Sequence, residues 1–174
     1  ISQTDVNEGW REHRRAGGVV VDIYTDEVVC SGLSMPHSPR WHQGKLYLHN
    51  SGKGEFGYVD LETKQFVPIC FVPGYLRGLT FTGDYAVAGM SQPRDNKSFS
   101  GLELSERLAE KGVSARCGLQ VIDLRDGSLP HSLNIDGFIN ELYDVVTLPG
   151  VQSSYAVGTQ KDEIRRVVRM GDFN

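Results

Sequence analysis

Charged side chains recur in this sequence at intervals that could bring them to one place in a folded chain. Arg40 and Arg77 are 37 residues apart, and Arg77 and Glu141 are 64 apart, or 39 when an insertion between them is removed. Guanidinium groups present planar sets of donors that suit a carboxylate, a phosphate or a sulfate. A site built on these residues would therefore bind a small anionic or polar molecule.

Further polar residues lie close to these positions in the sequence. Ser38 precedes Arg40 by two residues, and Arg94 follows an apolar run. Ser38 lacks the flanking glycines of a nucleophile elbow, so it is a binding candidate and not a nucleophile. The candidate ligand-binding residues are Arg40, Arg77, Arg94, Glu141 and Ser38. The alternative is that the arginines pair with Glu141 and Asp144 as part of the scaffold.

A second set of side chains could support acid–base or metal chemistry. His37 lies in an extended turn, and an imidazole titrates near neutral pH. With Glu141 and Asp144 it forms the candidate catalytic set of a metal-dependent hydrolase or lyase, in which acidic oxygens would bind a divalent cation. His37, His42 and His49 are spaced by 5 and 7 residues, which does not bring three ligands together. We therefore assign no metal ligand, and a divalent cation is the one cofactor that the alternative enzyme hypothesis would need.

The elements that position these residues repeat along the chain. Three segments share a β-branched run that ends in an aspartate, an apolar residue and a polar turn, and a second apolar run follows each: 18–30, 57–72 and 118–135. This pattern is typical of a β-hairpin. The aspartates Asp22, Asp60 and Asp123 are 38 and 63 residues apart.

The longer interval contains a polar insertion. Residues 92–116 include a capping-box pattern at 100–103 and a helix stop at Gly112, which predict a helix. Removing these 25 residues restores the interval of 38. A period near 40 with four short strands is typical of a β-propeller blade.

The predicted fold is all-β, with propeller-like blades of four antiparallel strands, about three and a half blades in number, and one helical insertion. The strands expected to open the later blades are 39–42 with 45–49, 76–81 with 85–89, and 141–146 with 155–158. First strands line the channel of a propeller, so Arg40, Arg77 and Glu141 should converge on one pocket mouth. The competing fold is a β-sandwich whose segments resemble one another by chance.

Composition limits the functional classes. The chain is expected to form a single domain over 1–174, with a tail at 161–174. A net charge of −4 gives no nucleic-acid footprint, and no apolar stretch reaches the roughly 20 residues that span a membrane. The three cysteines have no metal-type spacing and lie in apolar runs, which predicts buried thiols in a reducing compartment such as the cytoplasm.

Several motifs resemble an uncharacterised bacterial family known only as conserved hypothetical proteins, sometimes fused to tetratricopeptide repeats. The resemblance runs from about Trp10 to Gly158 and includes the motifs at 32–42, 50–55, 73–79, 91–94 and 141–145. It implies a propeller-like architecture with further blades on the N-terminal side, and it implies no activity. The chain would then be the C-terminal half or a shortened member.

Three functional hypotheses follow. The first is a propeller that binds a small anionic or polar ligand in an axial pocket. The second is the metal-dependent hydrolase or lyase described above, and the third is a protein-interaction scaffold that uses the insertion 92–116 for recognition. An open array of blades would expose sheet edges, so missing N-terminal blades or a homodimer would complete the ring.

Overall fold

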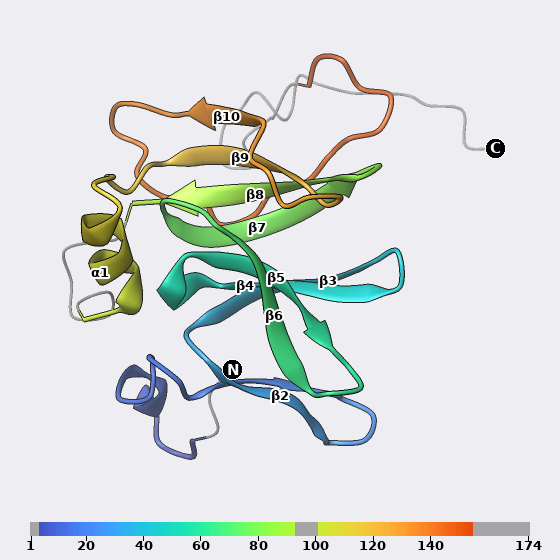
Figure 1. The fold of residues 1–174 in the computed structure, drawn as a ribbon, viewed down its shortest axis with the longest axis vertical. Coiled ribbons are helices and arrows are strands. Elements are labelled where there is room, and N and C mark those ends of the chain that lie inside the picture. Colours follow the sequence, from blue (N-terminus) through green and yellow to red (C-terminus); the bar gives the residue numbers. More distant parts are fainter. Residues whose placement is uncertain (1–3, 93–100, 155–174) are drawn as a thin grey trace, which may run out of the picture.

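The structure is a computed structural model that describes residues 4–92 and 101–154. Within these residues the chain consists mostly of β-strands, with a single α-helix and two short 3₁₀ helices (Figure 1). In chain order the elements are η1 (Gly9–Arg11), β1 (Gly18–Val21), β2 (Val28–Leu33), β3 (Pro36–His42), β4 (Lys45–Asn50), η2 (Ser51–Lys53), β5 (Glu55–Asp60), β6 (Gln65–Phe71), β7 (Tyr75–Thr82), β8 (Tyr85–Ser91), α1 (Glu103–Glu110), β9 (Gly118–Asp123) and β10 (His131–Asn134).

The strands form three antiparallel sheets. A two-stranded sheet pairs β1 with β2, and two four-stranded sheets have the orders β3-β4-β5-β6 and β7-β8-β9-β10. Within the described residues the sheets do not close on themselves into a barrel. The all-β prediction is confirmed, and the predicted hairpins are present. In Figure 1 the sheet β3–β6 lies between the other two.

Side chains of the middle sheet, β3–β6, point alternately to its two faces, and each face contributes to a buried apolar cluster. Tyr47 and Phe56 join Leu76, Leu79 and residues of β8 and β9 in the largest apolar cluster, between the two four-stranded sheets. Leu48 of β4 and Val59 of β5 lie on the opposite face of this sheet and pack with Cys30 and Leu33 of β2. The core is therefore two adjacent layers that share one sheet.

The three aspartates of the hairpin pattern make similar turns. The Asp22 Oδ1 atom accepts hydrogen bonds from the backbone N–H groups of Tyr24 and Thr25, at 2.8 and 3.2 Å. Asp60 Oδ1 likewise accepts hydrogen bonds from the backbone N–H groups of Glu62 and Thr63, at 2.9 and 3.0 Å. Asp123 Oδ1 accepts one from the Arg125 N–H at 3.0 Å. A carboxylate that satisfies turn amides in this way explains why each apolar run ends in aspartate.

Some apolar side chains depart from the expectation that they form the core. A tryptophan in a predicted strand is by default a core residue, yet Trp41 is 62% exposed on β3. All three cysteines are free thiols; Cys30 and Cys117 are buried as predicted, whereas Cys70 is half-buried. Burial raises the pKa of the Cys70 thiol to about 12, so it stays protonated at neutral pH.

The predicted helix is present, but its start differs from the capping-box prediction. It begins at Glu103, with Leu102 at the N-cap position and no side-chain cap. Its end is as predicted, because Gly112 adopts a φ of +62° and the Val113 N–H donates to the Leu108 carbonyl at 3.0 Å.

Helix α1 packs on the sheets through an apolar face. Leu102, Leu104 and Leu108 are buried against Tyr75. Deleting 92–116 would remove α1 and expose Tyr75 and Phe71, against which it packs, so the insertion is a structural element and not a loop that can be removed without cost.

The segment expected to open a further blade, 141–146, forms no strand and has no regular secondary structure. It lies along the second four-stranded sheet, where the Leu142 N–H donates to Ser91 Oγ at 2.9 Å and the Thr147 N–H donates to Thr80 Oγ1 at 3.3 Å. Its expected hairpin partner at 155–158 lies outside the described residues, so no ladder can be traced between them.

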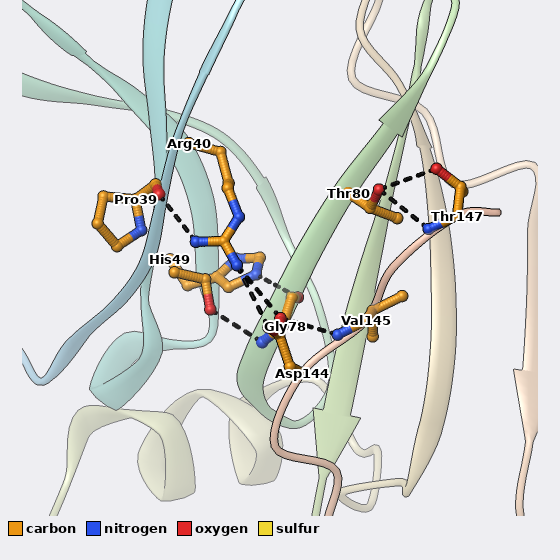
Figure 2. Close-up of polar contacts among 9 residues, drawn as sticks. Pro39, Arg40, His49, Gly78, Thr80, Asp144, Val145 and Thr147 are labelled. Atoms are coloured by element: carbon orange, nitrogen blue, oxygen red, sulfur yellow. Dashed lines mark hydrogen bonds and ion pairs between the residues drawn. The ribbon is translucent and has the colours of Figure 1, made fainter. Parts of the chain in front are cut away.

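Gly78 joins the two four-stranded sheets, as Figure 2 shows. It lies at a bulge in β7 with a φ of +75°. Its N–H donates to Ser38 Oγ of β3 at 2.9 Å, and its carbonyl accepts from His49 Nε2 of β4 at 2.9 Å. A Cβ here would lie 2.5 Å from the Val145 backbone nitrogen. Only glycine therefore allows β7, its neighbouring sheet and segment 141–146 to meet so closely.

We expect Gly78→Ala to lower the free energy of unfolding by about 3 kcal/mol, because the new methyl meets backbone and the positive φ is strained. The matched control is Gly44→Ala, which has a φ of +79° and open space around its Cβ position. The control should lose about 1 kcal/mol from backbone strain alone. Urea unfolding of both variants measures the difference, and equal losses would show that the junction has room for a methyl group.

His49 is the polar group most deeply buried at this junction. Its ring is fully buried, and burial lowers its pKa to about 4. The carbonyl of Gly78 can only accept, so Nε2 carries the proton, and Nδ1 has no hydrogen-bond partner among the described residues. The folded protein therefore holds His49 as a neutral imidazole, whereas the unfolded chain binds a proton near pH 6.5.

This difference makes stability depend on pH. A folded-state pKa below the unfolded value gives stability that is complete above about pH 6.5 and is lost as the pH falls towards 4. Between pH 7.5 and 5 the wild-type protein should lose about 2 kcal/mol more than His49→Gln, which keeps a donor for Gly78. Chemical denaturation at both pH values measures the loss. His131→Gln, at an exposed position, is the control and should match wild type; a His49→Gln variant as pH-sensitive as wild type would contradict the assignment.

Candidate ligand-binding pocket

A cavity of about 710 Å³ lies between the N-terminal segment and the starts of strands β3 and β7. Its volume is typical of pockets that bind small molecules. One wall consists of residues 4–8, Trp10, His13 and Arg14, and the other of Gly18, Met35, Pro36, His37 and Arg77.

The N-terminal wall is attached to the rest of the protein by polar contacts. Ser34 Oγ donates to the Arg14 carbonyl at 2.9 Å, and Arg15 pairs with Glu106 of α1 at 2.6 Å. Within the wall, the 3₁₀ helix η1 places the Arg11 guanidinium 4.8 Å from the centre of the Trp10 ring.

The negative charges of this wall are partly compensated. Arg11 hydrogen-bonds and pairs with Glu8 at 2.7 Å, and this hydrogen bond lowers the pKa of Glu8. Asp5 is the other carboxylate in the lining and is exposed. The wall therefore brings an aromatic surface and acidic oxygens near the mouth of the cavity.

Arg77 supplies positive charge on the opposite wall. Its guanidinium lies over the rings of Tyr75 and Tyr143, at 5.5 and 5.0 Å from their centres. The Nε–H is buried and has no acceptor among the described residues, and none of the ion pairs found there includes Arg77. A half-buried guanidinium held by aromatic rings, without a carboxylate, retains its charge for a ligand.

His37 lies beside Arg77 in the lining. Its Nδ1 is 2.8 Å from the Met35 carbonyl, which can only accept, so Nδ1 carries the proton and Nε2 is left as an acceptor. The Tyr75 hydroxyl lies 3.4 Å from the same Nδ1, and the two rings meet edge to face. Burial lowers the pKa of His37, and the charge of Arg77 lowers it further, so the ring is neutral at pH 7.

Burial also shifts the pKa of Tyr75, whose hydroxyl lies beside His37. Burial raises this pKa well above its usual range. The positive charge of Arg77 and its side-chain hydrogen bond to Tyr75 offset part of the rise. Tyr75 is therefore a neutral hydroxyl under Arg77 and cannot compensate the charge of the guanidinium.

The register of the strands changes which residues are equivalent. His37 pairs with His49 directly before a bulge in β3, and Arg77 pairs with Gly89 directly before a bulge in β7. The counterpart of Arg77 is therefore His37, not Arg40 as the interval of 37 residues suggested. Sequence spacing missed this because the interval between turn aspartates differs from the interval between bulges.

The structure brings some predicted site residues together and separates others. His37 and Arg77 line the cavity, whereas Arg40, Ser38, Glu141 and Asp144 are not in its described lining. Arg40 pairs with Asp144 at 3.3 Å, and Ser38 holds the Gly78 N–H, so both have structural contacts. Glu141 accepts a hydrogen bond from the Tyr143 hydroxyl at 3.1 Å. Arg94 lies outside the described residues.

The candidate catalytic set does not assemble into a metal site. Among residues 4–92 and 101–154, no three His, Cys, Asp or Glu side chains lie close enough to share an ion. His37 lines the cavity, while Asp144 is an exposed partner of Arg40. The three candidates therefore do not form one ligand set.

Sequence reasoning missed most of the N-terminal wall and the aromatic support of Arg77. Residues 4–8 carry no motif, and the sequence does not decide whether Trp10 lies in the core or at the surface. The Tyr75 and Tyr143 rings each lie two residues from a predicted charged site, at Arg77 and Glu141. Aromatic residues at that spacing beside charges were the one available signal.

The Arg40–Asp144 pair should contribute little to stability, because both side chains are largely exposed, at 42% and 64%. A double-mutant cycle with Arg40→Ala and Asp144→Ala should give a coupling free energy below about 1 kcal/mol. The comparison pair is Arg107–Glu55, which is 2.6 Å apart and less exposed, at 28% and 16%. Its coupling measured by urea unfolding should be larger, and the reverse order would contradict these assignments.

The fold and pocket together describe a mostly β protein of antiparallel sheets with a small-molecule-sized cavity that contains an arginine and a histidine. The chain belongs to the family described as Domain of unknown function (DUF4915), whose model matches residues 1–157. This agrees with the expected resemblance to an uncharacterised family. No curated protein and no solved structure gave a significant match. Among the described helices, none combines the length and apolar character needed to cross a membrane.

Proposed function

We propose that the chain is a propeller-like protein that binds a small anionic molecule in the cavity beside Arg77. In this proposal the two four-stranded sheets are successive blades, and the cavity lies near the axis on which their first strands converge. Additional blades or a second copy of the chain would complete the ring. The ligand enters between the N-terminal wall and the starts of β3 and β7.

The strand order supports the blade assignment. Each four-stranded sheet is a simple meander, and β3 and β7, the first strands of the two sheets, contact each other. Each of these first strands also has a bulge near the cavity, directly after His37 in β3 and directly after Arg77 in β7. Blades that meet through their first strands are the arrangement that surrounds a propeller channel.

The observation that carries the anion proposal is Arg77 itself. It lines the cavity, and none of the ion pairs among the described residues includes it, so no carboxylate there neutralises its charge. A ligand carboxylate, phosphate or sulfate in the cavity would accept hydrogen bonds from the terminal N–H groups of this planar cation. The apolar side chains of Val6, Met35 and Pro36 in the lining can contact the rest of the molecule.

Arg77→Gln should weaken binding of acidic ligands by about 10- to 100-fold, because hydrogen bonds to a charged group contribute about 1.5–3 kcal/mol. The probes are sodium sulfate, inorganic phosphate and a panel of small carboxylates, compared by calorimetry at constant ionic strength. The matched control is Arg40→Gln, which removes an arginine that is paired with Asp144 and is not in the described lining.

Arg40→Gln should bind within about twofold of wild type, because a largely screened surface charge contributes little to a pocket it does not line. The anion proposal fails if wild-type protein binds none of these probes. The proposed position of the anion site beside Arg77 is wrong if Arg40→Gln and Arg77→Gln weaken binding equally.

A further inference from the structure

The two polar side chains on the β3 and β7 side of the cavity, Arg77 and His37, differ in chemistry. Arg77 presents positive charge and donors, whereas His37 presents Nε2, whose proton is held instead on Nδ1 by the Met35 carbonyl. Both side chains line the same cavity, and they occupy equivalent positions directly before the bulges of β7 and β3. A ligand that satisfies the two groups must therefore accept at one point and donate at another.

We infer that the cavity selects a small carboxylic acid that carries a hydrogen-bond donor, a hydroxyl or an amino group, close to its carboxylate. This inference rests on the proposed anion site and specifies its ligand class. The carboxylate binds Arg77, and the neighbouring O–H or N–H donates to His37 Nε2. An acid without the donor leaves His37 Nε2 facing the ligand without a partner.

Other contacts at the cavity agree with such a ligand. The tautomer of His37 is set by the 2.8 Å contact with a carbonyl, so Nε2 cannot donate to a second carboxylate oxygen while the ring is neutral. No hydrogen bond to Nε2 comes from the residues that the structure describes. Trp10, Met35 and Pro36 provide an apolar surface for the body of the acid.

The test compares acids that share one body and differ in the group beside the carboxylate; the hydroxy acids keep the charge of the donor-free acid, whereas the amino acids add an ammonium charge. One series is 3-phenylpropanoate, 3-phenyllactate, phenylalanine and the O-methyl ether of 3-phenyllactate, and a smaller series is propionate, lactate and alanine. Calorimetry on the wild-type chain should give donor-bearing acids an affinity about five- to tenfold above that of the donor-free acid and the ether, as expected for one hydrogen bond in a pocket. Comparison of hydroxyl with amino acids identifies which donor is preferred.

Variants at His37 assign the preference to this residue. His37→Leu removes the acceptor and should reduce the difference between donor-bearing and donor-free acids to less than twofold. His37→Gln keeps an acceptor oxygen near the position of Nε2 and should retain part of the difference. Thermal unfolding of each variant confirms folding, and the comparison of ligands on wild-type protein does not depend on the variants.

The outcomes distinguish the inferred donor preference from the proposed anion site on which it rests. If acids bind in an Arg77-dependent manner but the donor makes no difference, the inference fails and the anion site stands. If the difference survives unchanged in His37→Leu, His37 is not the acceptor and the inference fails. If no acid binds wild-type protein, the anion site fails and the inference fails with it.

Discussion

The meeting of two sheets at one peptide unit constrains the rest of this structure. Gly78 gives its N–H to Ser38 and its carbonyl to His49, so both polar groups of a buried bulge are satisfied by the neighbouring sheet. The absence of a side chain lets segment 141–146 approach from the other side. Because a buried backbone group without a partner is costly, these bonds fix the relative position of β3, β4 and β7.

The position of the pocket follows from this junction. The residues directly before the two bulges are His37 and Arg77, and both line the cavity next to the joined strands. Side chains on paired, hydrogen-bonded strands are held more rigidly than those on loops. The junction therefore places an acceptor and a cation on a firm wall, and the N-terminal segment supplies the facing surface, with its aromatic ring at Trp10.

The sequence was sufficient to predict the hairpins but not the register of the strands. Asp22, Asp60 and Asp123 marked the turns because their carboxylates bond the turn amides, a local effect that is visible in residue order. The bulges depend on contacts between sheets, and the sequence carries no comparable mark for them. Extrapolating from spacing therefore aligned Arg77 with Arg40 instead of His37. Trp41 shows the same limitation, because alternation indicates two faces of a strand but not which face is covered.

The shared middle sheet links the two halves of the core. Tyr47 and Leu48 are adjacent in β4, yet one packs with the β7–β10 sheet and the other with the β1–β2 hairpin. Removing either neighbour would leave an apolar face of β3–β6 in water. The three sheets are therefore expected to fold and unfold as one cooperative unit. A protease cut or a truncation between them would yield aggregating fragments and not smaller independent domains.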